Sequence, residues 1–297
     1  MTRAYGIDVI GGPSWGTDVG TALSRIRWHQ TPRANLPSLP EACEGDDWRL
    51  EHDLDRLWVS VEGGASFFLE LPDDAPAEVE VHLDGWEAEK ASLFFLMGVL
   101  PLALPRFKLT PLHGAAFSPD GKSASIVMGD SGMGKTTTLA RNIARGASFL
   151  ADDACAIDDR GMLWPAPPCW ASRDEPSTSR HDYLGKAVHL VDHVLPGPID
   201  VSSAIVLRPE RGAELGVERL SAHESMLAVI RNQRSPWLFT SRTEQARRLT
   251  ATAAIASRPV GVARFDQGVH TPDELGDAID AWADPLRRAP ESASVMQ

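Results

Sequence analysis

Residues 124–146 read ASIVMGDSGMGKTTTLARNIARG, and this stretch decides the fold. Its first five residues are mostly apolar and predict a buried strand that ends at Gly129. The glycines that follow allow the backbone to curl sharply. Residues 137–145 then predict a helix, which Gly146 closes as a left-handed cap. The stretch therefore predicts a strand, a glycine-rich loop and a helix in direct succession.

This loop matches the eight-position phosphate-binding template, the P-loop, at every fixed position. Successive backbone N–H groups in such a loop point at one anion, and the helix N-terminus adds the positive end of its dipole. Lys135 is expected to reach the β- and γ-phosphates, and the Thr136 hydroxyl to hold Mg²⁺. We therefore predict that ATP with Mg²⁺ is bound by Gly129, Asp130, Ser131, Gly132, Met133, Gly134, Lys135, Thr136 and Thr137.

Two acidic residues end the strand predicted after this helix. Asp152 and Asp153 follow residues 148–151, where a P-loop protein is expected to carry a metal-directed carboxylate. Transfer of a phosphoryl group to a hydroxyl needs one carboxylate near the metal and one within reach of the attacking oxygen. The pair can supply both, and the sequence leaves open which aspartate accepts the proton and whether Asp152 binds the metal.

The composition excludes several classes of function. With 297 residues, 43% of them hydrophobic and 24% charged, the chain resembles an ordinary soluble globular protein, and one large α/β domain with a smaller one attached is expected. A formal charge of −12 disfavours nucleic acid and anionic membranes as partners, because both are bound largely through Lys and Arg. The cysteines Cys43, Cys155 and Cys169 lack metal or redox spacing, which favours reduced thiols in the cytoplasm.

Two segments are considered as a secretory signal or a membrane-spanning helix, and neither fits. Residues 1–10 carry Arg3 and Asp8 and no sustained apolar core, so we expect no secretory signal. Residues 91–104 are shorter than the roughly 20 residues of a membrane-spanning helix and contain Pro101. They predict a buried helix.

Three regions follow from the patterns. Residues 1–85 alternate apolar and polar positions, which predicts a β-rich, antiparallel region for scaffolding or substrate recognition. The alternation is clearest at Leu57, Val59, Val61, Phe67, Leu69, Leu71, Val79, Val81 and Leu83. Residues 86–288 predict the P-loop domain, and residues 289–297 a disordered tail.

The second half of the P-loop region contains one predicted loop and several regular elements. Residues 164–179 are rich in Pro and polar residues and predict a lid or substrate clamp. Strands are expected at residues 204–207, 216–220 and 260–265. Helices are expected after the Ser221–Glu224 capping box, over residues 239–256, and after Thr271.

Four motifs in register, around His113-Gly114, the P-loop, Arg145-Gly146 and Asp152-Asp153, resemble the catalytic core of the HPr kinase/phosphorylase family. The chain is more distantly similar to phosphoenolpyruvate carboxykinase. The resemblance covers about residues 111–160 and implies an α/β fold with a P-loop kinase core of HPr kinase/phosphoenolpyruvate carboxykinase type. It also implies ATP- and Mg²⁺-dependent phosphorylation of a serine or threonine hydroxyl on a peptide or small protein.

The resemblance assigns catalytic roles to His113, Lys135 and Asp153, with Asp152 as a second candidate for the base or for the metal. Some family features are missing. Thr136-Thr137 replaces the Ser-Glu that follows the family's lysine, and the segment Glu-x-Arg-Gly-Leu-Gly is not visible, which makes a phosphorylase activity doubtful. Glu175 is a candidate replacement for the missing metal ligand.

The N-terminal region differs from the family's regulatory domain, which suggests a divergent branch such as the kinases that phosphorylate lasso-peptide precursors. Arginines that could clamp a phosphoryl group are Arg173, Arg180, Arg231 and Arg234, although solvated surface arginines are the simpler interpretation. HPr kinases assemble into rings, so the resemblance leaves a homo-oligomer as one possible state of this protein.

Two other functions are compatible with the P-loop. One is a nucleotide-sensing module without transfer chemistry, in which ATP closes a loop to switch a partner. The other is a small-molecule enzyme resembling the carboxykinases, for which the sequence offers no evident set of extra metal ligands.

Overall fold

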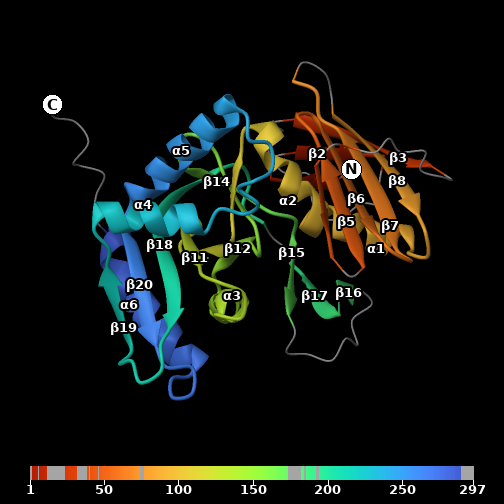
Figure 1. Ribbon diagram of the computed structural model, residues 1–297. Coiled ribbons are helices and arrows are strands. Elements are labelled where there is room, and N and C mark those ends of the chain that lie inside the picture. Colours follow the sequence, from red (N-terminus) through yellow and green to blue (C-terminus); the bar gives the residue numbers. More distant parts are fainter. Residues whose placement is uncertain are drawn as a thin grey trace.

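The computed structural model describes residues 2–5, 7–11, 24–31, 39, 41–45, 47–73, 77–172, 182–183, 185–191 and 194–288. Over these residues the chain has a mixed α/β fold with a β-rich N-terminal sheet, as predicted (Figure 1). The tail of residues 289–297 lies outside the described residues, as do Arg173, Glu175 and Arg180.

The N-terminal sheet contains eight strands within the described residues, in the order β1-β2-β3-β8-β7-β6-β5-β4. Its strands are β1 Thr2–Ala4, β2 Ile7–Ile10, β3 Ser24–Thr31, β4 Glu41–Glu44, β5 Trp48–His52, β6 Arg56–Val61, β7 Ala65–Glu70 and β8 Ala77–Leu83. The prediction of an antiparallel sheet is wrong in part, because β3 runs parallel to both β2 and β8. Alternation in a sequence indicates which face is buried, but it does not encode the direction of the neighbouring strand.

One face of this sheet is covered by the helical run Ala88–Phe107, which comprises α1 Ala88–Phe94, η1 Phe95–Val99, α2 Leu100–Ala103 and η2 Leu104–Phe107. Phe67 on β7 stacks on Phe94 and Phe95, and Trp28 on β3 meets Phe95 edge to face at 5.4 Å between ring centroids. By length and composition alone the run could cross a membrane, but 67% of its most apolar window is buried in the protein. The prediction of a buried helix is confirmed.

The second sheet has nine strands in the described part of the chain and carries the P-loop. It contains β9 Thr110–Leu112, β10 Gly114–Ser118, β11 Ser123–Met128, β12 Ser148–Ala151, β13 Cys155–Ile157, β14 Met162–Trp164, β18 Ile199–Pro209, β19 Gly216–Arg219 and β20 Val260–Phe265. Strands β11, β18 and β20 are parallel neighbours. The residues of β11 from Ala124 to Met128 are fully buried, as expected for a central strand.

The helices of this part are α3 Lys135–Ala144, α4 Ala222–Arg231, α5 Arg242–Ala256 and α6 Pro272–Arg288. The capping box at the start of α4 is confirmed, since Ser221 and Glu224 exchange both hydrogen bonds. Helix α5 begins later than the predicted residue 239. Phe239 has a left-handed φ of 51°. The Ser241 side chain accepts a hydrogen bond from the backbone N–H of Glu244, which makes Ser241 the N-cap.

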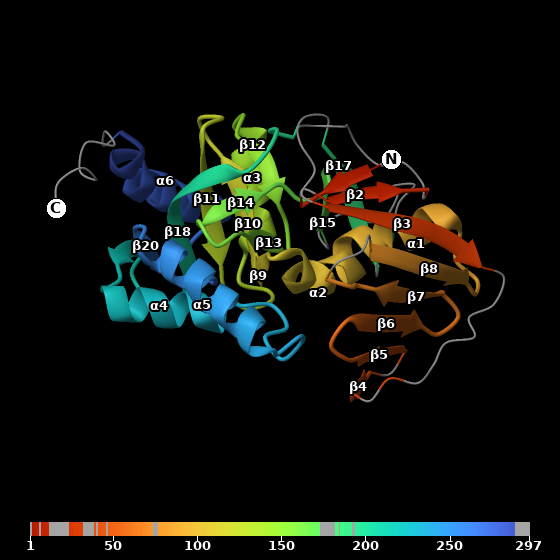
Figure 2. The same ribbon diagram turned by 90° about the horizontal axis from the view of Figure 1, so that it is seen from above.

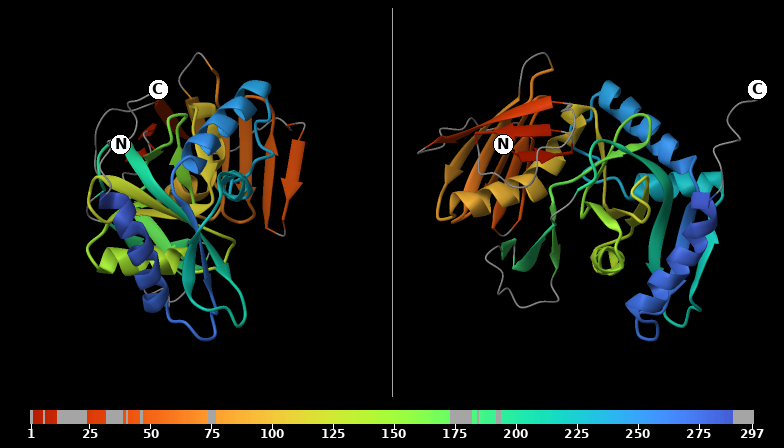
Figure 3. Two further views of the ribbon diagram at one scale, coloured as in Figure 1. Left: turned by 90° about the vertical axis from the view of Figure 1, so that its left-hand side faces the viewer. Right: turned by 180° about the vertical axis from the view of Figure 1, so that it is seen from behind.

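A small third sheet replaces part of the predicted loop at residues 164–179. Strand β15, Cys169–Ser172, pairs with β17, Lys186–Leu190, which pairs in turn with β16, Asp182–Tyr183. The loop prediction was wrong for Cys169–Ser172, because backbone hydrogen bonds to β17 hold this Pro-flanked segment extended. This sheet lies beside α3, away from α4, α5 and α6 (Figures 1 and 3).

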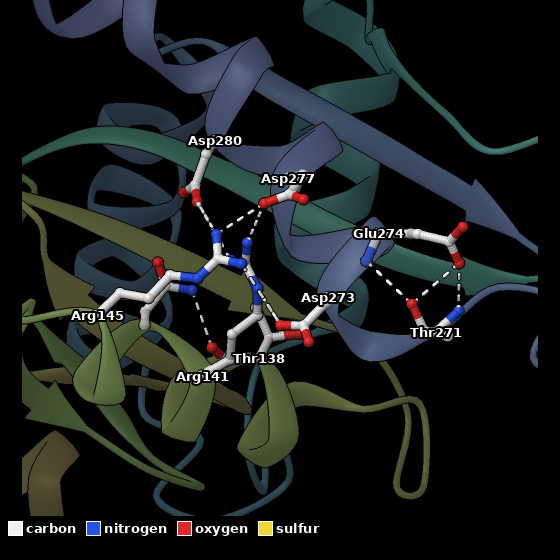
Figure 4. A network of polar contacts seen from close by, with 9 residues as sticks. Thr138, Arg141, Arg145, Thr271, Asp273, Glu274, Asp277 and Asp280 are labelled. Atoms are coloured by element: carbon white, nitrogen blue, oxygen red, sulfur yellow. Dashed lines mark hydrogen bonds and ion pairs between the residues drawn. The ribbon is translucent and has the colours of Figure 1, made fainter.

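The P-loop helix α3 is tied to α6 by a buried arginine. Arg141 on α3 bonds Asp273 and Asp280 at 3.2 and 3.1 Å and also contacts Asp277 (Figure 4). Gly276 allows this approach, because a Cβ atom there would lie 2.1 Å from the Arg141 guanidinium. Figure 2 shows α6 next to α3, at the opposite end of the molecule from the N-terminal sheet.

We predict that Phe67→Ala lowers the free energy of unfolding by about 3–5 kcal/mol, since it removes a fully buried ring between the N-terminal sheet and its covering helix. Urea denaturation measures the change. Leu54→Ala, at a side chain that is 73% exposed, is the control and should change stability by less than about 0.5 kcal/mol. A loss below about 1 kcal/mol at Phe67 would contradict the packing.

Candidate functional site

The P-loop joins β11 to α3 in the predicted order. Gly129, Gly132 and Gly134 adopt φ values of 142°, 83° and 95°, which side chains rarely tolerate. A Cβ atom at Gly129 would also lie 3.1 Å from the carbonyl oxygen of Leu207 on the neighbouring strand β18. The first N–H groups of α3 have no acceptor within the helix. The loop and helix start thus form a cradle suited to a phosphate group.

Lys135 is buried at the first position of α3, with 8% of its surface exposed. Its Nζ donates to the carbonyl oxygens of Gly129 and Asp130 at 2.8 and 2.9 Å, and lies 3.0 Å from Nε2 of His113. These acceptors account for all three protons of an ammonium group. Burial lowers the pKa of Lys135, while the nearby aspartates Asp153 and Asp152 oppose this shift.

Thr136 and Asp152 form the second part of the site. The Thr136 hydroxyl donates to Oδ1 of Asp152 at 3.0 Å, and the backbone N–H of Ala171 on β15 lies 3.4 Å from Oδ2. Asp152 is 9% exposed. Burial, followed by the charge of Asp153, raises the pKa of Asp152 to about 6.

Asp153 is held between two nitrogen-bearing side chains. Arg234 contacts its carboxylate and also donates to its carbonyl oxygen at 3.1 Å. Nδ1 of His113 lies 3.3 Å from both Oδ1 and the carbonyl oxygen. This double contact depends on the left-handed backbone of Asp153, with a φ of 67°. Burial opposes ionisation of Asp153, but the His113 hydrogen bond and Arg234 outweigh it and hold its pKa well below the ordinary value.

His113 connects Lys135 to Asp153. It lies in the break between β9 and β10, and its backbone N–H donates to the carbonyl oxygen of Asn232 at 2.6 Å. When Lys135 donates to Nε2, the Nδ1 nitrogen carries the ring proton and can donate to Asp153. The ring therefore fixes the lysine and the carboxylate relative to each other.

The segment after α4 holds this arrangement through Asn232, which sequence reasoning missed, and through Arg234, one of the predicted clamps. The Asn232 side chain accepts a hydrogen bond from the backbone N–H of Gly129 at 3.0 Å. The backbone N–H of Arg234 donates to Pro111 on β9 at 2.8 Å. Of the four arginines considered as clamps, Arg234 lies at the site, whereas Arg231 is exposed at the end of α4.

These groups line a cavity of about 230 Å³. The walls are formed by the P-loop, His113, Asp152, Asp153, Ala171, Ser172 and Lys186. Lys186 on β17 is a residue that sequence reasoning missed, and its charge lowers the pKa of Asp152 against the larger effect of burial. No motif surrounds it in the sequence, because it reaches the cavity only through the pairing of β17 with β15.

The N-terminal sheet is joined to the second half of the chain through Tyr5. Tyr5, in the turn between β1 and β2, is 1% exposed, and its backbone N–H donates to Pro165 at 2.7 Å. Burial raises the pKa of its hydroxyl well above the ordinary value, with opposing effects from Arg234 and Asp153.

The donor set is compatible with Mg²⁺ bound together with phosphates. Thr136 and Asp152 provide adjacent oxygen ligands of the kind that Mg²⁺ prefers. Among the described residues, no group of three or more His, Cys, Asp or Glu side chains could hold a metal by itself. An ion here would therefore need water and phosphate oxygens to complete its octahedral shell, as is usual for Mg²⁺.

We predict that Asp152→Asn stabilises the nucleotide-free protein, and that the gain depends on pH. Because burial raises the pKa of Asp152 in the folded protein to about 6, the native state disfavours the charge that Asp152 carries at higher pH. The gain should be small near pH 4, grow as the pH rises from about 4 to 6, and level off above pH 6 at about 2–3 kcal/mol.

Urea denaturation in EDTA between pH 4 and 8 measures this gain. Asp159→Asn, in the exposed turn after β13, is the matched control and should show no such rise with pH. A pH-independent difference between Asp152→Asn and the wild type would contradict the raised pKa.

No protein-family model matches the sequence, and no curated protein matches it. Among solved structures, the Hpr(Ser) kinase/phosphatase from Coxiella burnetii is similar over 60% of this chain and 92% of its own. The two share 12% sequence identity, and the TM-score is 0.32. This similarity is distant, and it assigns neither a family nor an activity to the chain.

Proposed function

We propose that the chain is an ATP- and Mg²⁺-dependent kinase with a P-loop core of HPr kinase type, which phosphorylates a serine or threonine hydroxyl of a peptide or small protein. The observation that carries the proposal is the convergence of Lys135, His113 and Asp153 on one cavity beside the P-loop. A nucleotide-binding loop alone would not need a carboxylate held in this place.

Lys135 and the loop would bind the phosphates. To do so, the ammonium must exchange at least one of its present acceptors, the carbonyl oxygens of Gly129 and Asp130 and the His113 ring, for a phosphate oxygen. Lys186, which also lines the cavity, adds a second positive charge. When bound, ATP with Mg²⁺ supplies the phosphoryl group and an ion that screens its charge.

The two aspartates have different surroundings, which supports different roles. Asp152 contacts the Thr136 hydroxyl and suits the metal. Asp153 suits the acceptor hydroxyl, which it would orient by accepting its hydrogen bond. The depressed pKa makes Asp153 a weak base in this arrangement, but phosphoryl transfer proceeds largely through a loose transition state that demands little proton removal early on.

Transfer forms a bond between the acceptor oxygen and the γ-phosphorus and breaks the bond to the leaving ADP oxygen. The hydroxyl proton passes to Asp153 or through it to water. His113 would keep Asp153 and Lys135 in fixed positions relative to each other during this step. The proposal includes a cytoplasmic location. It also includes a peptide substrate, such as a lasso-peptide precursor, and excludes nucleic acid and membranes as partners.

A nucleotide sensor without transfer chemistry is the second candidate. The ion pair with Arg234 favours it, because a carboxylate already neutralised by an arginine is less available to an acceptor hydroxyl. Such a module would bind ATP and hydrolyse it slowly without labelling any acceptor.

We predict that the protein with γ-labelled ATP, Mg²⁺ and host lysate, or the peptide encoded beside its gene, transfers label to one acceptor. Lys135→Ala should abolish the labelling, since it removes the buried cation at the loop. Lys122→Ala, at an exposed lysine in the turn before β11, is the matched control and should label normally. ATP binding without a labelled acceptor would favour the sensor.

We predict that Asp153→Asn lowers the transfer rate at least about 100-fold, the usual range for loss of a proton-accepting group, while ATP binding is retained. Single-turnover transfer and equilibrium binding of a fluorescent ATP analogue measure the two effects. Asp159→Asn serves as the matched exposed control. Normal transfer by Asp153→Asn would remove this residue from the proposed chemistry.

A further inference from the structure

A second cavity, of about 290 Å³, lies on the other side of the P-loop. It shares Gly132, Gly134 and Thr137 with the phosphate cavity, so the two spaces meet at the start of α3. Its remaining wall comes from the end of β20, the β20–α6 turn and the first turn of α6. A molecule with its phosphates in the P-loop could therefore extend into this cavity without crossing the protein core.

We propose that this cavity binds the nucleoside part of the nucleotide, a heteroaromatic base with its ribose. The inference rests on the proposed nucleotide-dependent function and deepens it. The volume is close to the lower end of small-molecule pockets, roughly 300 Å³, which suits a nucleoside and not a whole nucleotide.

The cavity has the chemistry that a base requires. Met133, Phe265 and Leu275 provide apolar surface, and Phe265 and Leu275 are only 4% and 5% exposed, which indicates a fixed wall. An apolar wall favours a planar ring by removing its faces from water.

The rim of the cavity is polar. Nδ1 of His270 accepts a hydrogen bond from the backbone N–H of Asp266 at 3.0 Å, so in the neutral ring the proton lies on Nε2. That nitrogen is then a donor for a ring nitrogen or carbonyl oxygen of a base. Gln267 reaches from the same turn to the P-loop, where its side-chain N–H lies 3.3 Å from the Gly132 carbonyl oxygen.

The wall is positioned by the same helix that positions the phosphates. Arg141, two turns after Lys135 on α3, holds Asp273, Asp277 and Asp280 of α6 (Figure 4). Thr271 and Glu274 exchange hydrogen bonds at the start of α6 and fix its first turn. Because one arginine connects the two helices, the distance between the phosphate cradle and the nucleoside wall is set within one rigid unit.

The test compares ATP with inorganic tripolyphosphate, which offers the phosphates without a nucleoside. Binding of each, with Mg²⁺, is measured by isothermal titration calorimetry for the wild type and for two cavity variants, His270→Ala and His270→Trp. Val269→Ala is the matched control, because Val269 lies in the same turn, is 71% exposed and does not line the cavity. Lys135→Ala reports on the phosphate cradle.

We expect the wild type and Val269→Ala to bind ATP more tightly than tripolyphosphate. His270→Ala should weaken ATP about 10-fold, and His270→Trp, which fills the space, more strongly, while both bind tripolyphosphate normally and thereby show that they are folded. Unchanged ATP binding in both variants, with binding still lost in Lys135→Ala, would overturn the nucleoside cavity and leave the proposed function standing. Loss of neither ligand in Lys135→Ala would count against the proposed function itself.

Discussion

The buried ammonium of Lys135 is the interaction on which the rest of the site depends. A charged group with 8% exposure is costly to bury unless each of its protons finds an acceptor. Two loop carbonyls and the His113 ring supply these acceptors, so they must all converge on one point. The curled loop and the position of His113 in the break between β9 and β10 both satisfy this single requirement.

A chain of polar contacts continues outward from that point. His113 contacts both Lys135 and Asp153. Asp153 in turn contacts Arg234, whose backbone N–H donates a hydrogen bond to β9. The neutral His113 ring separates the cationic Lys135 from the anionic Asp153. Asp153 and the cationic Arg234 are in direct contact, so each partly compensates the desolvation of the other. The two aspartates are adjacent, yet their pKa values are shifted in opposite directions, because Asp152 is buried without a cationic contact among the described residues, whereas Asp153 contacts His113 and Arg234.

The strong local patterns allowed much of the fold to be predicted. The P-loop, the strand before Asp152 and the caps of α4 and α6 are formed by residues close together in sequence, so propensity and hydrogen bonding agree there. Errors occurred where distant segments decide the outcome. The parallel pairing of β3 and the strand at Cys169–Ser172 both depend on partners that alternation cannot identify.

The candidate site divides in the same way. The sequence by itself determined the phosphate cradle, Lys135, Thr136 and the aspartate pair. The cradle and the first two residues lie within one strand, turn and helix, and the aspartate pair follows the next strand. Only the tertiary structure brought Arg234, Asn232 and Lys186 to the same place. They come from two segments distant in sequence, the chain after α4 and strand β17, and their convergence results from tertiary packing, which leaves no short-range signal in the sequence.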